Sequence, residues 1–140
     1  MIIRRTLAAA AVAAAALSTL ALGAGSANAA TSGTYCGATQ QLDGDVYAQA
    51  CLTVSGYSVY PSLHVTSHGS HAITGVVWVN HNGNYEDYAT CYGMTASDPG
   101  SQCNAGWDWI GAGGYAQAQA QLVIDGSWSS KVYSPSEYIG

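Results

Sequence analysis

The chain has 140 residues, of which only 8% are charged, and its formal net charge is −5. A length of this order fits a single domain. Because lysine and arginine together number three, the chain has too few cations to neutralise a nucleic-acid backbone or to bind an anionic membrane surface, and we expect neither partner.

The first 29 residues have the organisation of a secretory signal peptide. Arg4 and Arg5 give a charged start, residues 7–22 are almost entirely Ala, Leu and Val, and Ala27-Asn28-Ala29 fits a small-residue cleavage site. The apolar run is too short and too rich in alanine for a membrane span. We therefore predict a secreted, extracellular protein whose residues 30–140 form one domain. In that domain Lys131 is the only strong cation against eight carboxylates, a net charge of −7 with histidine neutral.

Four cysteines lie in the predicted mature domain: Cys36, Cys51, Cys91 and Cys103. An even number in a short secreted chain predicts two disulfides. Three pairings are possible, and we favour Cys36–Cys51 and Cys91–Cys103 because each pair is close in sequence and brackets one turn or loop. The spacing matches no zinc cluster and contains no C-x-x-C, so we expect no redox or metal chemistry from these thiols.

After the signal, apolar residues alternate with a period of two, which predicts strands and no helices. The predicted strands, in chain order, are 46–54, 59–66, 73–80, 85–92, 115–124 and 128–133, with 94–106 as a loop. Asn82-Gly83 and Asp125-Gly126 are tight hairpin signals. About seven short strands with frequent turns predict an all-β sandwich or barrel. Its inward alanines need large partners, for which Trp78 and Trp128 are the candidates.

Several of these features occur together in one known group of proteins. They are the opening Tyr35-Cys36, the strand 46–54 with its Cys51, Trp78, the Asp125-Gly126 hairpin and the closing segment 132–136. With them the chain resembles the small secreted immunoglobulin-like β-sandwich proteins of actinobacteria. The resemblance implies an immunoglobulin-like antiparallel sandwich and no particular activity. The chain departs from antibody domains, because no Cys…Trp…Cys core bridge is readable.

The aromatic residues supply the leading candidate site. The chain has four Trp and ten Tyr but no Phe, a bias that suits binding surfaces, since these rings combine apolar area with a polar tip. In an extended segment Trp107 and Trp109 share a face and would stack on sugar rings, with Asp108 accepting hydroxyl hydrogen bonds. The alternative is that one or both plug the end of the sandwich. Tyr85, Tyr88 and Tyr92 form a second candidate patch, in which Tyr88 and Tyr92 share a strand face with Glu86.

The titratable residues give weaker candidates. His64, His68 and His71 lie within eight residues, with His81 further on, but their spacing fits no known ligand motif, and solvated polar residues are the alternative. We expect no bound metal. The carboxylate pairs Asp43/Asp45 and Glu86/Asp87 would suit calcium or glycoside chemistry only if they converged. Turn-forming aspartates are the simpler interpretation of the first pair.

No motif predicts catalysis, because the chain lacks a G-x-S-x-G elbow and a phosphate-binding glycine loop. We therefore expect no enzyme and no cofactor. The leading hypothesis is a non-catalytic, monomeric binding module for extracellular polysaccharide or cell-envelope glycan. The alternative is an inhibitor of an extracellular hydrolase, an extracellular protein partner that would be contacted through the 94–106 loop. A further alternative is a histidine-based metal-binding protein.

Overall fold

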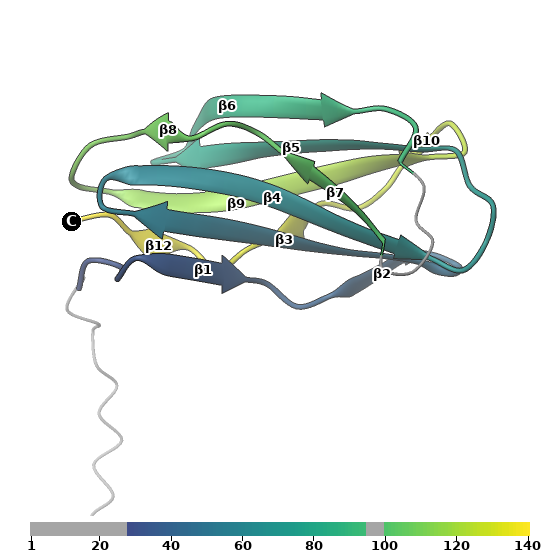
Figure 1. Ribbon diagram of the computed structural model, residues 1–140, viewed down its shortest axis with the longest axis horizontal. Coiled ribbons are helices and arrows are strands. Elements are labelled where there is room, and N and C mark those ends of the chain that lie inside the picture. Colours follow the sequence, from purple (N-terminus) through teal and green to yellow (C-terminus); the bar gives the residue numbers. More distant parts are fainter. Residues whose placement is uncertain (1–27, 95–99) are drawn as a thin grey trace, which may run out of the picture.

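The computed structural model describes residues 28–94 and 100–140, which form two antiparallel sheets packed face to face (Figure 1). The predicted all-β sandwich is confirmed. The described residues contain no helix, and so none that is long and apolar enough to cross a membrane. Residues 1–27 of the predicted signal peptide lie outside the described residues.

The first sheet is built around one long hairpin. Strands β3 and β4 pair along their whole length, from Val46 opposite Ser67 to Ser55 opposite Ser58, and Gly56 makes the turn with a φ of 59°. The order is β1-β3-β4-β7, with β2 also paired to β3 and β8 to β4. The strands are β1 (Gly33–Cys36), β2 (Gln40–Asp43), β3 (Val46–Ser55), β4 (Ser58–Ser67), β7 (Ser101–Asn104) and β8 (Asp108–Trp109).

The second sheet has β9 and β5 at its centre. The order is β10-β9-β5-β6, with β11 and β12 also paired to β9. The strands are β5 (Ile73–His81), β6 (Asn84–Cys91), β9 (Tyr115–Ile124), β10 (Ser127–Trp128), β11 (Val132–Tyr133) and β12 (Glu137–Tyr138). The alternation in β9 is as predicted, because its alanines, Leu122 and Ile124 are buried, whereas the residues between them are at least partly exposed.

Twelve strands lie in the described part of the chain, more than the seven or so predicted. The predicted 94–106 loop contains β7, and the predicted strand 128–133 is divided into β10 and β11. The Ser129 hydroxyl explains this division, since it accepts a hydrogen bond from the Leu122 N–H group of β9; the Ser134 hydroxyl, after β11, accepts one from the Ala118 N–H group in the same way. A continuous strand would accept these bonds through its carbonyl groups.

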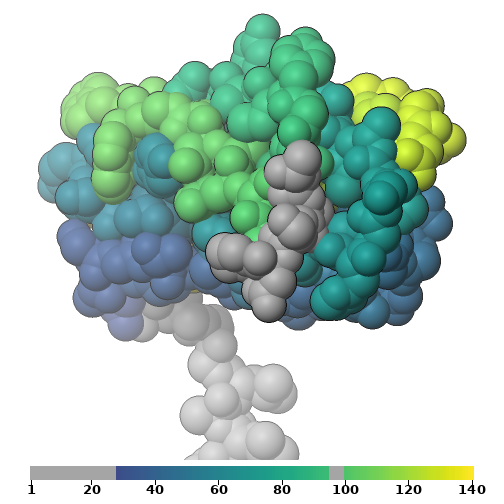
Figure 2. All heavy atoms as spheres, turned by 45° about the vertical axis from the view of Figure 1, so that its right-hand side comes forward, coloured from purple at the N-terminus to yellow at the C-terminus, as the bar shows by residue number. Residues whose placement is uncertain are grey.

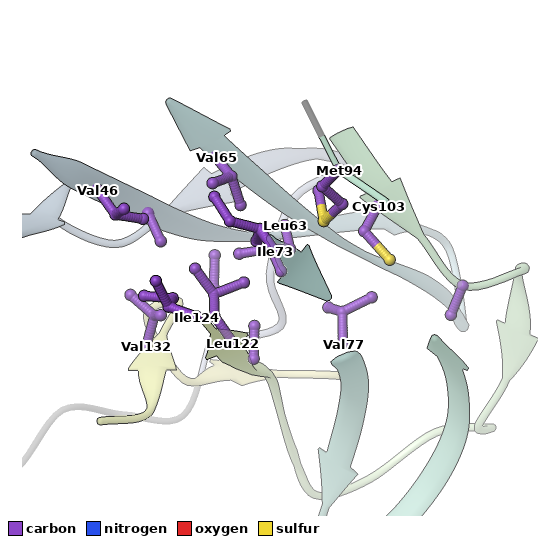
Figure 3. Close-up of a cluster of buried hydrophobic side chains, with 14 residues drawn as sticks. Val46, Leu63, Val65, Ile73, Val77, Met94, Cys103, Leu122, Ile124 and Val132 are labelled. Atoms are coloured by element: carbon purple, nitrogen blue, oxygen red, sulfur yellow. The ribbon is translucent and has the colours of Figure 1, made fainter. Parts of the chain in front are cut away.

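The core lies between the two sheets. Figure 3 shows Val46, Leu63 and Val65 of the first sheet facing Leu122, Ile124 and Val132 of the second. A second cluster fills the other end of the sandwich; its buried members are Leu52, Val54, Val59, Val79, Ala116, Ala118 and Ile139. Branched aliphatic side chains therefore pack against the inward alanines.

Tryptophan does not fill the core, so the predicted roles of Trp78 and Trp128 there were wrong. Trp128 is 64% exposed on the short strand β10. Trp78 lies between Val77 and Val79, which belong to the core clusters, so its side chain points to the outer face of the second sheet. Val76 and Trp78 make that outer face apolar as well, which is why alternation in β5 did not identify the inner face.

Both predicted disulfides are present. Cys36 and Cys51 are direct cross-strand neighbours in β1 and β3. Cys91 and Cys103 join β6, at the edge of the second sheet, to β7, at the edge of the first. In Figure 2 the green surface of residues 100–110 accordingly lies beside that of β6. The second bridge thus connects the two layers of the sandwich.

Candidate binding surfaces

Trp107 and Trp109 lie at the edge of the first sheet and are both exposed, by 56% and 73%. The Trp107 ring packs on Tyr60 of β4, with ring centroids 5.3 Å apart and an angle of 37° between the planes. Trp109 pairs with Ser58, two residues from Tyr60 and therefore on the same outer face. We call Tyr60, Trp107 and Trp109 the edge platform.

The backbone around the edge platform is pinned to β4. The N–H of Ala105 donates to Pro61 O at 3.3 Å, and the N–H of Ile110 donates to Tyr57 O at 3.1 Å. Gly111 follows with a φ of 73°, and a Cβ there would lie 3.4 Å from Cη2 of Trp109. The platform is therefore held on a sheet edge rather than on a free loop.

Asp108 does not join the two tryptophans. It pairs with Val59, a buried core residue, so its side chain is directed away from the outer face. Its Oδ2 is buried and has no hydrogen-bond partner within residues 28–94 and 100–140. Burial first, and then the charges of Glu86 and Asp87, raise the pKa of Asp108. The predicted trio is thus two exposed rings plus a half-buried carboxylate beside other acids.

The histidines are spread over the molecule. His64 lies on the outer face of β4, with Nε2 3.5 Å from Ser62 Oγ, whereas His81 lies at the end of β5, with Nε2 3.3 Å from Gly113 O. His68 is exposed in the connection after β4. In the part of the chain that the structure describes, no three potential ligands gather in a metal-binding arrangement.

His71 instead links two aspartates from distant turns. When the imidazole is protonated, its Nε2 donates to Asp45 Oδ1 at 2.7 Å and its Nδ1 donates to Asp125 Oδ2 at 2.6 Å. Asp125 also accepts the Ala72 N–H at 2.9 Å. Both carboxylates raise the pKa of His71, and the hydrogen bond to the Asp125 carboxylate has the largest effect. In turn, the hydrogen bonds from His71 lower the pKa of both aspartates. This arrangement, the histidine clasp, joins the β2–β3, β4–β5 and β9–β10 connections.

A second aromatic surface lies on the outer face of the second sheet. A bulge in β6 leaves Asp87, with a φ of 20°, as an extra residue between Tyr88, opposite Trp78, and Glu86, opposite Val79. The prediction that Tyr88 shares a face with Glu86 was therefore wrong, since the extra residue reverses the alternation. Instead Tyr85 and Tyr88 lie together beside Trp78. Sequence analysis named Tyr85 and Tyr88 as members of one patch but did not group them with Trp78, because that grouping depends on the bulge and a bulge has no signature in composition.

The segment proposed as an inhibitory loop is not a free loop at either end. Met94 is buried in the core, and residues 101–104 form β7. Residues 95–99 lie outside the described residues.

The fold and these surfaces define a small disulfide-linked β-sandwich with exposed aromatic surfaces on its two outer faces. Comparison of the chain with protein-family models, with curated proteins and with solved structures gives no match.

Proposed function

We propose that this protein is a secreted, non-catalytic module of immunoglobulin-like type that binds extracellular polysaccharide through the edge platform. The observation that carries the proposal is the exposure of Trp107 and Trp109 beside Tyr60 on one sheet edge. A soluble domain gains nothing in stability from exposing two indoles, and exposed aromatic groups of this kind mark interaction sites. The flat apolar face of a sugar ring is a natural partner for such rings, because hydroxyl groups project from its rim.

The charge around the edge platform favours an uncharged glycan. Asp108 lies in the same short strand as Trp109, and Glu86 and Asp87 are close enough to raise its pKa. Like charges would repel an acidic polysaccharide from this end of the sandwich. Neutral β-linked chains such as cellulose and chitin are therefore the first ligands to test.

The test is depletion of the purified protein from solution by insoluble cellulose, chitin and cell-wall material. We expect depletion by at least one of them, and at least tenfold weaker binding when Trp107 and Trp109 are both replaced by alanine. Trp128→Ala is the matched control, since Trp128 is also an exposed indole but lies in the second sheet. If the double variant and Trp128→Ala lost binding equally, or if no material depleted the protein from solution, the proposal would be contradicted.

A further inference from the structure

The outer face of the second sheet contains a pocket of about 320 Å³. Its lining residues come from β5, β6, β9 and the segment between β10 and β11: Val76, Trp78, Tyr85, Tyr88, Gln121 and Lys131. This volume is at the lower end of the range of roughly 300–1,000 Å³ found for ligand pockets, which suits a ligand with a single ring. Tyr85 and Tyr88 are 68% and 74% exposed, so the pocket is reached directly from solvent.

Trp78 lines the pocket and is almost fully buried. Its exposed fraction is only 8%, and within the described residues its Nε1–H has no hydrogen-bond partner. An indole N–H is a donor only, and a buried polar group without a partner is destabilising. The Nε1–H is covered by neighbouring atoms, so the pocket offers a ligand the ring of Trp78 rather than its N–H.

Lys131 gives the pocket its charge. Its Nζ lies 5.5 Å from the centroid of the Trp78 ring, within the range of a cation–π interaction. An aromatic cluster of this kind would otherwise suit a cationic ligand. Because Lys131 already occupies that position, a second cation would meet a like charge, whereas a carboxylate would meet an opposite one.

Gln121 adds a group that recognises hydroxyls. Its Nε2 donates to Ser129 O at 2.7 Å, and its amide oxygen accepts no hydrogen bond from the residues that the structure describes. Such an oxygen accepts a hydrogen bond from a hydroxyl group. The pocket thus combines aromatic faces, one cation and one amide acceptor.

We propose that this pocket binds a sugar acid, a uronate unit whose carboxylate interacts with Lys131 while its ring lies against Tyr88. This site is distinct from the edge platform, since the two surfaces lie on opposite outer faces of the sandwich. It therefore does not rest on the proposed function. A ligand of about 13 non-hydrogen atoms at ordinary ligand efficiency has a dissociation constant of about 1 mM.

The experiment is a titration of the purified protein with galacturonate, galactose, benzoate and choline, followed by NMR of the indole N–H signals. We expect galacturonate to shift the Trp78 signal and to bind at least tenfold more tightly than galactose. Equal affinity for the two sugars, tighter binding of benzoate or choline, or an unmoved Trp78 signal would overturn the proposal. Tetragalacturonate distinguishes two sources of the ligand. If the site is built for a polymer, tetragalacturonate should bind at least as tightly as galacturonate. If it is built for a free acid, galacturonate should bind more tightly than tetragalacturonate.

Variants locate the site. Lys131→Gln should weaken galacturonate binding at least fivefold, whereas Lys131→Arg should retain it. Asn104→Asp changes the net charge equally on the opposite face and is the matched control. Tyr88→Ala should also weaken binding, whereas Tyr92→Ala, another exposed tyrosine outside the pocket, should not. Retained galacturonate binding in folded Lys131→Gln would refute the assignment. Trp107→Ala should leave galacturonate binding intact, which separates this site from the edge platform.

Discussion

Cys91 and Cys103 are bonded across the edge of the sandwich, from β6 in one sheet to β7 in the other. Cys36 and Cys51, by contrast, join neighbouring strands of the same sheet. One bridge therefore holds the two layers together, and the other reinforces a strand pairing that backbone hydrogen bonds already make.

Removing the bridge between the sheets should destabilise the protein without changing its fold. We expect Cys91→Ser combined with Cys103→Ser to lower the free energy of unfolding by about 2–4 kcal/mol, because the unfolded chain loses its constraint. Urea denaturation measures this difference. A loss below about 1 kcal/mol would show that the inter-sheet bridge is not structurally important.

The histidine clasp should make stability depend on pH in both directions. The raised pKa of His71 gives a contribution that is complete below its ordinary value of 6.5 and is lost as the pH rises through the folded value. The lowered pKa values of Asp45 and Asp125 give a contribution that is complete above 3.8 and is lost as the pH falls. The clasp should therefore contribute most between about pH 4 and 6.5.

Melting temperatures measured from pH 3 to 9 check this dependence. His71→Gln should be destabilised most within that window and should follow wild type outside it. His68→Gln replaces an exposed histidine three residues away and should behave as wild type throughout. If both variants gave the same profile, the clasp would have no role in stability.

A substitution of Gly75 should destabilise the core. A Cβ at this position would lie 2.6 Å from Met94 Sδ and 2.9 Å from Leu63 Cδ2, so both side chains would have to shift to admit a methyl group. We expect Gly75→Ala to cost about 1–3 kcal/mol of unfolding free energy. Gly33→Ala is the control, since a Cβ there meets nothing within 4 Å. Equal stability of the two variants would disprove the close contact.

Asp108 should be a destabilising residue at neutral pH. Its raised pKa means that folding penalises the charged carboxylate, and the penalty grows as the pH rises above 3.8. We expect Asp108→Asn to raise the melting temperature at pH 7, with the gain disappearing as the pH falls below 3.8. Asp43→Asn removes the same charge at an exposed position and should give a smaller gain. A lower melting temperature for Asp108→Asn at pH 7 would contradict the assignment.

Alternation was sufficient to predict the long strands. In β3 and β9 one face is apolar and the other mostly polar, so the period and the inner face can be read together. The disulfide pairing also follows from spacing. The β-branched strand β5 is apolar on both faces, and its alternation left the position of Trp78 undetermined.

The candidate sites depended on features that the sequence pattern does not carry. Trp107 and Trp109 were predicted as a pair, but the packing of Trp107 on Tyr60 was not predicted, and the position of Trp109 on the same face depends on the register between β8 and β4. The pocket on the second sheet depends on the extra residue in β6. The histidine clasp needs three turns to meet at one end of the fold, with Asp45 and Asp125 lying 26 and 54 residues from His71.

The most direct test of glycan binding is an NMR titration of the protein with chitohexaose and cellohexaose that follows all four indole N–H signals. Binding at the edge platform predicts that the Trp107 and Trp109 signals shift together in a saturable way while those of Trp78 and Trp128 stay in place. If the Trp107 and Trp109 signals remain unmoved by both oligosaccharides, or shift no more than that of Trp128, the edge platform is not a glycan-binding site.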